Sequence, residues 1–360
     1  MSYALTATIA SSLSLAVMII LDRLMVGDCY QGRAKQAWFV SSMAGSLFGV
    51  VLTLITWVVA VQVGSIDSLW AIFQITHNIM WPYGALMLLA GVLSIQVLLH
   101  YFYCFSEDAN STVMAAWFAA TPIFVFIITM VLSMMANLGF PFLETLQSEE
   151  GIKLEYIAGI LIATIGLVGF ELSTTSQKGN VYKYRFHLMM MLITNSLYGI
   201  VIYTTLANAS NVTEHAVLAL MPFYWIGFAA GARALVKKSE RETFKKLFRK
   251  RIKYFIIPIL LSEIIGMLVF FLEYFGLGSL EPTYVALVIG AHVGVVYMLN
   301  LYLAMLGKRM RQNNQQKLYL LGIRLLESKM PLMAASWTSM AMELVFILLA
   351  IAGIIAVSTH

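Results

Sequence analysis

Long apolar runs recur from one end of the chain to the other, and they limit the possible folds more than any other feature. An apolar run of about 20 residues, coiled as a helix, matches the thickness of a bilayer core. Only 11% of the 360 residues are charged, against about 25% in a soluble globular domain. Strands of a membrane barrel would instead alternate in polarity over about ten residues. The sequence therefore predicts an all-α integral membrane protein.

Ten apolar runs are long enough to cross a membrane as helices. The predicted spans are 3–23, 38–62, 82–105, 112–135, 153–173, 186–206, 215–236, 254–275, 283–306 and 333–357. The first run lacks the basic flank and the cleavage site of a signal peptide, so we expect it to remain as a helix. The stretch 68–80 is too broken for a span and is interpreted as an interfacial lead-in to the third helix.

The basic residues sort onto one side of this ten-span arrangement. Of the 23 Lys and Arg residues, all but Lys153 fall at or after the ends of the first, fifth, seventh and ninth spans. The positive-inside rule makes that side cytoplasmic and puts both termini opposite, in what we interpret as a bacterial inner membrane. The basic run 237–251 is then a loop beside anionic lipid rather than a nucleic-acid site. Residues 308–330 are predicted to form an amphipathic helix on the cytoplasmic face.

The ten spans divide into two halves of five. Residues 1–175 form the first half, 176–185 the connecting loop and 186–360 the second half. Because five is odd, a duplicated second half must be inverted in the bilayer. The sequence trace of duplication is faint: the Tyr-Phe pairs at 101–102 and 274–275 precede turns that differ in length by one residue.

Short motifs in the first half resemble a known transporter family. They are YFY at 101–103 before a polar turn, AATP at 119–122, and a closing helix YIAGILIATIGLVGF at 156–170. The second half ends with LLAIAGIIAV at 348–357, which is similar to that closing helix. The chain from Gly84 to Glu171 thereby resembles the EamA-like branch of the drug/metabolite transporter superfamily.

The resemblance implies a ten-helix carrier of small organic molecules, with a central cavity between two inverted five-helix repeats. The chain departs from the family in two places. The second half usually has a proline in its fourth helix, where this chain reads GAHVG at 290–294. Family members are also commonly described with cytoplasmic termini, whereas the charge distribution here predicts the opposite.

Three ionisable residues fall near the middle of predicted spans: Glu263, His292 and Glu343. A charge inside the bilayer is costly, so such residues tend to mark function. A buried carboxyl group can exchange a proton, and a histidine changes charge near neutral pH. The alternative is that each is a neutral, hydrogen-bonded packing residue. The first-half counterpart of the Glu263 segment, 87–99, has no ionisable residue, which makes Glu263 the first candidate.

Further polar or aromatic side chains are candidates to line a substrate or proton path: Asn195, Tyr198, Tyr224, Trp225 and Gln96. Amides, hydroxyls and aromatic rings can bind a substrate, although packing is the ordinary role of each. Asp22 and Glu273 lie near predicted span ends, where water or lipid headgroups reach, and we expect no functional role for them.

These features predict a secondary transporter of small organic metabolites or drugs by alternating access, with coupling to protons or sodium as an option. The alternatives are a translocase for lipids or polyprenyl-linked precursors, a membrane enzyme, and a non-transporting scaffold of the same fold. The sequence lacks nucleotide-binding, HExxH and paired CxxC motifs, so we predict no enzyme activity, metal or cofactor. The expected partners are a small-molecule substrate and membrane lipid, with no nucleic acid. Cys29 and Cys104 are interpreted as reduced thiols.

Overall fold

Most of the chain that the structure describes is helical and apolar. The computed structural model describes residues 2–62, 83–106, 114–115, 117–118, 120–136, 154–174, 181–207, 237–250, 256–278, 280, 282–312, 319–320, 323–324 and 337–358. Of these residues, 94% are helical. Within these described ranges, five helices are long and apolar enough to cross a bilayer: Tyr3–Gly27, Ala85–Ser106, Tyr184–Leu206, Ile256–Tyr274 and Pro282–Leu299. The protein is therefore a multi-pass integral membrane protein.

The helices follow the predicted spans closely. In the first half they are α1 (Ser2–Asp28), α2 (Ala34–Gln62), α4 (Ala85–Ser106), α6 (Thr121–Ala136) and α7 (Leu154–Thr174). In the second half they are α8 (Val181–Leu206), α11 (Ile256–Leu277), α12 (Pro282–Gly290), α13 (His292–Gln312) and α14 (Trp337–Ser358). The predicted span 215–236 and the stretch 68–80 lie outside the described residues.

Helix α1 continues five residues beyond the predicted end of the first span. The apolar residues that follow Arg23 extend the helix, so that Asp22 lies within it rather than at its end. The connection to α2 turns tightly, because φ is positive at Gln31 (55°) and at Gly32 (71°). The Gly32 N–H donates to the Val26 carbonyl oxygen at 2.8 Å, which closes the end of the helix.

Two predicted spans are interrupted, one in each half. In the fourth span the N–H of Ala120 donates to the carbonyl oxygen of Trp117 at 2.9 Å, directly before α6. In the ninth span the N–H of Ala291 donates to the carbonyl oxygen of Val288 at 3.2 Å, between α12 and α13. These bonds tighten the chain from α-helical to 3₁₀ spacing. Pro122 explains the first break, since it has no N–H for a continuous helix.

Two segments differ from the sequence-based predictions. The basic run predicted as a loop forms a polar helix, α10 (Lys238–Lys250). The prediction of a continuous amphipathic helix over 308–330 is wrong: α13 ends at Gln312, and β1 (Tyr319–Leu320) pairs antiparallel with β2 (Ile323–Arg324). A glycine separates these strands in the sequence, and glycine disfavours a helix.

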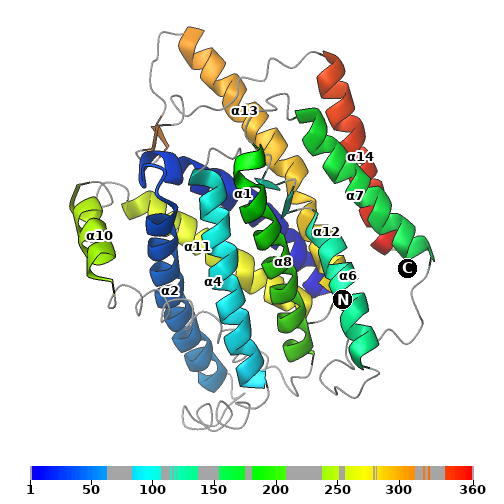
Figure 1. The fold of residues 1–360 in the computed structure, drawn as a ribbon, viewed down its shortest axis with the longest axis horizontal. Helices are drawn as coiled ribbons and strands as arrows, with labels where there is room; N and C mark the ends of the chain where they lie inside the picture. Colours follow the sequence, from blue (N-terminus) through cyan, green and yellow to red (C-terminus); the bar gives the residue numbers. More distant parts are fainter. Residues whose placement is uncertain are drawn as a thin grey trace.

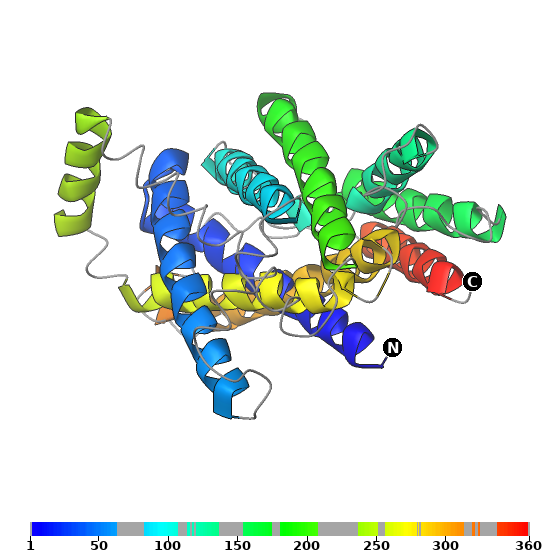
Figure 2. The same cartoon turned by 90° about the horizontal axis from the view of Figure 1, so that it is seen from below.

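Three helix pairs organise the bundle. Helix α1 packs along α11, α4 along α8, and α7 along α14. Figures 1 and 2 both show α7 and α14 side by side at one edge of the molecule, with α10 at the opposite edge. Large apolar side chains cover the outer faces, among them Leu13, Leu54 and Ile165. A surface of this kind suits lipid hydrocarbon rather than water.

A pair of histidines joins α4 to α8. The Nδ1 atoms of His100 and His187 are 2.8 Å apart, so one ring donates a hydrogen bond to the other. Tyr103 stacks on His187 with ring centroids 4.6 Å apart. Since α4 belongs to the first half and α8 to the second, this contact fastens the two halves of the chain to each other.

Candidate functional site

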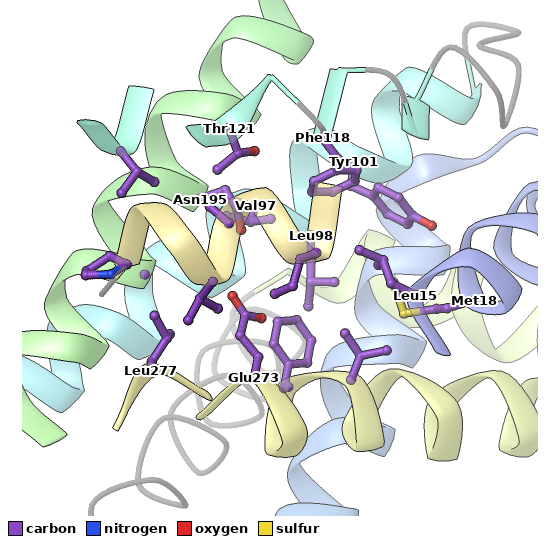
Figure 3. A pocket seen from close by; sticks show the side chains of 18 residues that line it. Leu15, Met18, Val97, Leu98, Tyr101, Phe118, Thr121, Asn195, Glu273 and Leu277 are labelled. Atoms are coloured by element: carbon purple, nitrogen blue, oxygen red, sulfur yellow. The ribbon is translucent and has the colours of Figure 1, made fainter. Parts of the chain in front are cut away.

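Two neighbouring cavities lie inside the bundle. The larger has a volume of about 70 Å³ and is drawn in Figure 3. Its lining comes from α1, α4, α6, α8, α11, α12 and the short helical piece before α6: Leu15, Met18, Val97, Leu98, Tyr101, Phe118, Thr121, Val125, Asn195, Gly199, Val269, Phe270, Glu273, Leu277, Pro282, Val285, Ala286 and Ile289. Both halves of the chain thus contribute to one cavity.

The larger cavity is apolar apart from a few converging polar groups. Figure 3 shows the Glu273 carboxyl of α11 directed into the cavity, with Asn195 of α8 and Thr121 of α6 across from it. Thr121 is only 5% exposed, and its hydroxyl has no hydrogen-bond partner among the residues that the structure describes. A buried polar group without a partner is costly unless a ligand or water satisfies it.

The smaller cavity, of about 30 Å³, contains two carboxyl groups. It is lined by Met18, Asp22, Ser41, Gly45, Leu98, Ser262, Glu263, Gly266, Met267 and Phe270. Asp22 comes from α1 and Glu263 from α11, so the packing of these two helices brings the carboxyl groups together. Their exposed fractions are only 5% and 7%.

Hydroxyl groups hold both carboxyl groups in place. Ser262 donates to Asp22 Oδ1 at 2.6 Å, and Tyr101 donates to Asp22 Oδ2 at 3.0 Å. Ser41 donates to Glu263 Oε2 at 2.9 Å. Four helices, α1, α2, α4 and α11, therefore meet at this acidic pair. Hydrogen bonds of this kind orient a buried carboxyl group and offset part of the cost of its burial.

Tyr30, in the turn after α1, lies close to the acidic pair. It is fully buried. Burial, with the nearby Glu263, Cys29 and Asp22, raises the pKa of Tyr30 well above its usual value. Its hydroxyl therefore stays protonated and uncharged at physiological pH, so it adds no charge near the acidic pair.

The two cavities share part of their walls. Met18, Leu98 and Phe270 line both. Tyr101 forms a further link, because its side chain lines the larger cavity while its hydroxyl bonds to Asp22 in the smaller one. A movement of the side chains in one cavity can thus be transmitted to the other through Tyr101 and the three shared apolar side chains.

The structure separates the predicted site residues. Glu263 lines the smaller cavity and Asn195 the larger. Tyr198 is buried and its hydroxyl bonds to that of Tyr274, away from both linings. Gln96 is exposed on the outer face of α4. Tyr224, Trp225 and the side chain of Glu343, a residue of α14, lie outside what the structure describes.

His292 lies beside the larger cavity without lining it. It is 0% exposed and begins α13 directly after the break in the ninth span. Its Nδ1 lies 2.6 Å from the Ile289 carbonyl oxygen, so Nδ1–H is the donor and Nε2 is left as an acceptor. Nε2 has no partner among the described residues. The His292 ring makes an edge contact with the ring of Phe118, with the two ring centroids 6.3 Å apart. Phe118 does line the cavity.

Two important carboxyl groups escaped the sequence analysis. The expectation that Asp22 is accessible to water is wrong, because α1 continues past it and the side chain is buried. Glu273, also set aside as a helix-end residue, contributes to the cavity wall. The sequence carried a signal for each of the two. For Asp22, apolar residues continue after Arg23; for Glu273, the EYF motif that it begins aligns with HYF at 100–102 in the first half.

The chain matches no protein-family model and has no significant match among curated proteins.

Proposed function

We propose that the protein is a secondary transporter that moves small organic molecules by alternating access, with the architecture of the EamA-like transporters. In this proposal ten spans form two inverted five-helix repeats. The helix pairing supports it. Exchanging each first-half helix for its second-half equivalent turns the α1–α11 pair into α8–α4, and the contact of α1 with α13, which follows the break in the ninth span, into that of α8 with α6, which follows the break in the fourth. The α7–α14 pair is exchanged with itself.

A pair of tyrosine hydrogen bonds supports the same repeat. Tyr101 and Tyr274 occupy equivalent positions in the aligned HYF and EYF motifs. Tyr101 of the third span bonds to Asp22 of the first, and Tyr274 of the eighth bonds to Tyr198 of the sixth. Each tyrosine thus ties the third helix of its own half to the first helix of that half, as a duplicated unit would.

The observation that carries the proposal is the meeting of two interrupted helices at the larger cavity. Phe118 and Thr121 flank the break in the fourth span, and Ile289 precedes the break in the ninth; all three line the cavity. Many transporters bind substrate between inverted repeats at discontinuous helices, where broken backbone lines a cavity.

The acidic pair is suited to proton coupling. Glu263 and Glu273 are both on α11, and ten residues correspond to about 15 Å along a helix axis. The two carboxyl groups therefore lie at well-separated points along α11. A proton on Asp22 or Glu263 removes the repulsion between two buried negative charges. Because Tyr101 bonds to Asp22 and also lines the larger cavity, the protonation state can bias how that cavity is shaped.

The basic residues give the proposed orientation. Arg23, Arg33 and Lys35 lie where α1 leads into α2, Arg185 lies near the start of α8, and α10 is basic. Putting this end in the cytoplasm follows the positive-inside rule. The acidic cavity then lies towards the cytoplasmic side of a bacterial inner membrane, with both termini on the other side.

The test is solute-driven proton movement in proteoliposomes that enclose a pH-sensitive dye. A panel of small amines, alcohols, carboxylates and amino acids is added outside. We expect at least one class to change the internal pH, and we expect Asp22→Asn and Glu263→Gln to abolish the change. The matched control is Glu242→Gln on the exposed face of α10, which should leave it intact. Sodium-dependent uptake without proton movement would contradict proton coupling, and no uptake of any solute would contradict transport.

A further inference from the structure

We propose that the larger cavity binds a small organic amine in its cationic form, with the Glu273 carboxylate as its counter-ion. The proposal rests on the transport function proposed above, because it names the substrate class of the same cavity. It follows from the charge, the hydrogen-bonding groups, the walls and the size of that cavity.

The charge of the lining points to a cation. Among the lining residues that the structure describes, Glu273 is the single charged side chain, and no Lys, Arg or His accompanies it. A carboxylate or phosphate ligand would lie next to a group of its own sign in an apolar cavity. A neutral ligand would bring no counter-charge, so the buried group would be held as the neutral acid rather than as the carboxylate. A cationic ligand supplies the counter-charge that the carboxylate form requires in an apolar cavity.

The hydrogen-bonding groups fit an ammonium. A primary ammonium has three N–H donors and no acceptor. The Glu273 carboxylate, the Asn195 side-chain carbonyl and the Thr121 hydroxyl supply three acceptors from α11, α8 and α6 (Figure 3). The Thr121 hydroxyl is the decisive group among them. It lines the cavity, it is 5% exposed, and the described part of the chain offers it no partner.

The start of α6 does not supply an alternative anion site. Helix N-termini bind anions through free N–H groups. Here Pro122 has no N–H, and the Ile123 N–H already donates to the Ala120 carbonyl oxygen at 3.2 Å. The helix end that borders the cavity therefore offers little to a carboxylate.

The walls and the volume set the size of the amine. Phe118, Phe270 and Tyr101 bring aromatic rings to the lining, which suit both a hydrocarbon body and a nearby cation. A volume of about 70 Å³ compares with about 10–15 Å³ for one water, so the cavity holds about five water-sized groups. n-Butylammonium, with five non-hydrogen atoms, matches this size.

The experiment compares three probes of nearly equal shape and different charge: n-butylammonium, 1-butanol and butyrate. Binding to the purified full-length protein in lipid nanodiscs is measured by calorimetry at constant pH and ionic strength. We expect n-butylammonium to bind to the unaltered protein. Its affinity should fall about tenfold in Glu273→Gln, and in Thr121→Val it should fall but remain measurable. Butyrate should bind better to Glu273→Gln than to the unaltered protein. A misfolded variant cannot produce that reversal, and Glu242→Gln is the matched control.

Each outcome decides between the proposals. Loss of n-butylammonium binding in Glu273→Gln, with the reversed preference for butyrate, supports the amine site. Preferential binding of butyrate or 1-butanol to the unaltered protein overturns the amine class but leaves transport standing if the proteoliposomes still take up those solutes. Absence of binding by n-butylammonium, with solute uptake intact in Glu273→Gln, also overturns the amine site. Absence of both binding and uptake overturns the transport function as well.

Discussion

The seam between α7 and α14 gives the most sharply defined prediction, because two glycines leave no room for a side chain. A Cβ atom added at Gly353 would lie 2.3 Å from the Ala163 nitrogen and 2.6 Å from the Gly159 carbonyl oxygen. A Cβ atom at Gly166 would lie 2.4 Å from the Ala350 nitrogen. In both cases the obstacle is backbone of the facing helix, which cannot rotate away as a side chain can.

The size of the effect follows from this geometry. A relaxed carbon contact needs about 3.5 Å, so Gly353→Ala must increase the distance between the two helices by about 1 Å. A gap of that size removes a quarter to a half of the dispersion attraction along the seam. In a membrane, packing of this kind drives helix association without help from a hydrophobic effect. We therefore expect a loss of about 2–3 kcal/mol in the free energy of unfolding for either substitution.

The double variant sharpens the prediction. Once the first alanine has separated the helices, the second enters space that is already open. Gly166→Ala with Gly353→Ala should therefore cost less than the sum of the single substitutions. Simple additivity would mean that each alanine is accommodated locally and that the two helices do not move as units.

The assay is thermal or denaturant unfolding in one defined detergent, followed by circular dichroism. Gly27→Ala is the matched control, because no atom lies within 4 Å of a Cβ at that position of α1. There the gain in helix propensity, up to about 1 kcal/mol, should leave stability unchanged or raised. If Gly353→Ala is as stable as Gly27→Ala, the close approach of α7 and α14 is refuted.

Two further predictions concern buried hydroxyl groups. Tyr198→Phe and Tyr274→Phe should each lower the free energy of unfolding by about 1–3 kcal/mol, because each removes the hydrogen bond between the two buried hydroxyls, and the double variant should cost less than their sum in a double-mutant cycle. An additive cycle would show that the two hydroxyls do not interact. Ser262→Ala should cost about 1–2 kcal/mol through loss of the 2.6 Å bond to Asp22, whereas Ser46→Ala, which loses a 3.1 Å bond to the Ser42 carbonyl within its own helix, should be nearly neutral. Equal effects of the two serine substitutions in the same unfolding assay would contradict the role given to Ser262.

Much of the helix pattern could be predicted because hydrocarbon length fixes where spans can lie. The errors arose where a local rule competed with that signal. Arg23 was taken to end the first span, although a long basic side chain can extend towards the interface from within a helix. The basic run 237–251 was predicted only as a cytoplasmic connection between spans; its residues are good helix formers, and the segment folds as α10.

The candidate site was only partly predictable, since depth in a span does not tell which way a side chain faces. Glu263 and Gln96 are both at mid-depth, yet the first lines a cavity and the second is exposed. That difference comes from how α11 and α4 are rotated in the bundle, which depends on contacts distant in sequence. Asp22 and Glu273 were missed for the converse reason: they are near span ends but face inward.

Under the proposed inverted repeat, the chemical difference between the two halves of the chain involves more residues than Glu263 alone. The two equivalent tyrosines make equivalent bonds, but Tyr101 bonds to a carboxyl group and Tyr274 to a phenol. The residues just before them also differ: His100 pairs with His187 across α4 and α8, whereas Glu273 faces the larger cavity. Under the proposed inverted repeat the two halves share one framework, and they differ in where a carboxyl group lies: beside the tyrosine in the first half and in the wall of the larger cavity in the second. Under the proposed function, a proton site and a substrate site can be separate yet connected, because Tyr101 contacts both cavities.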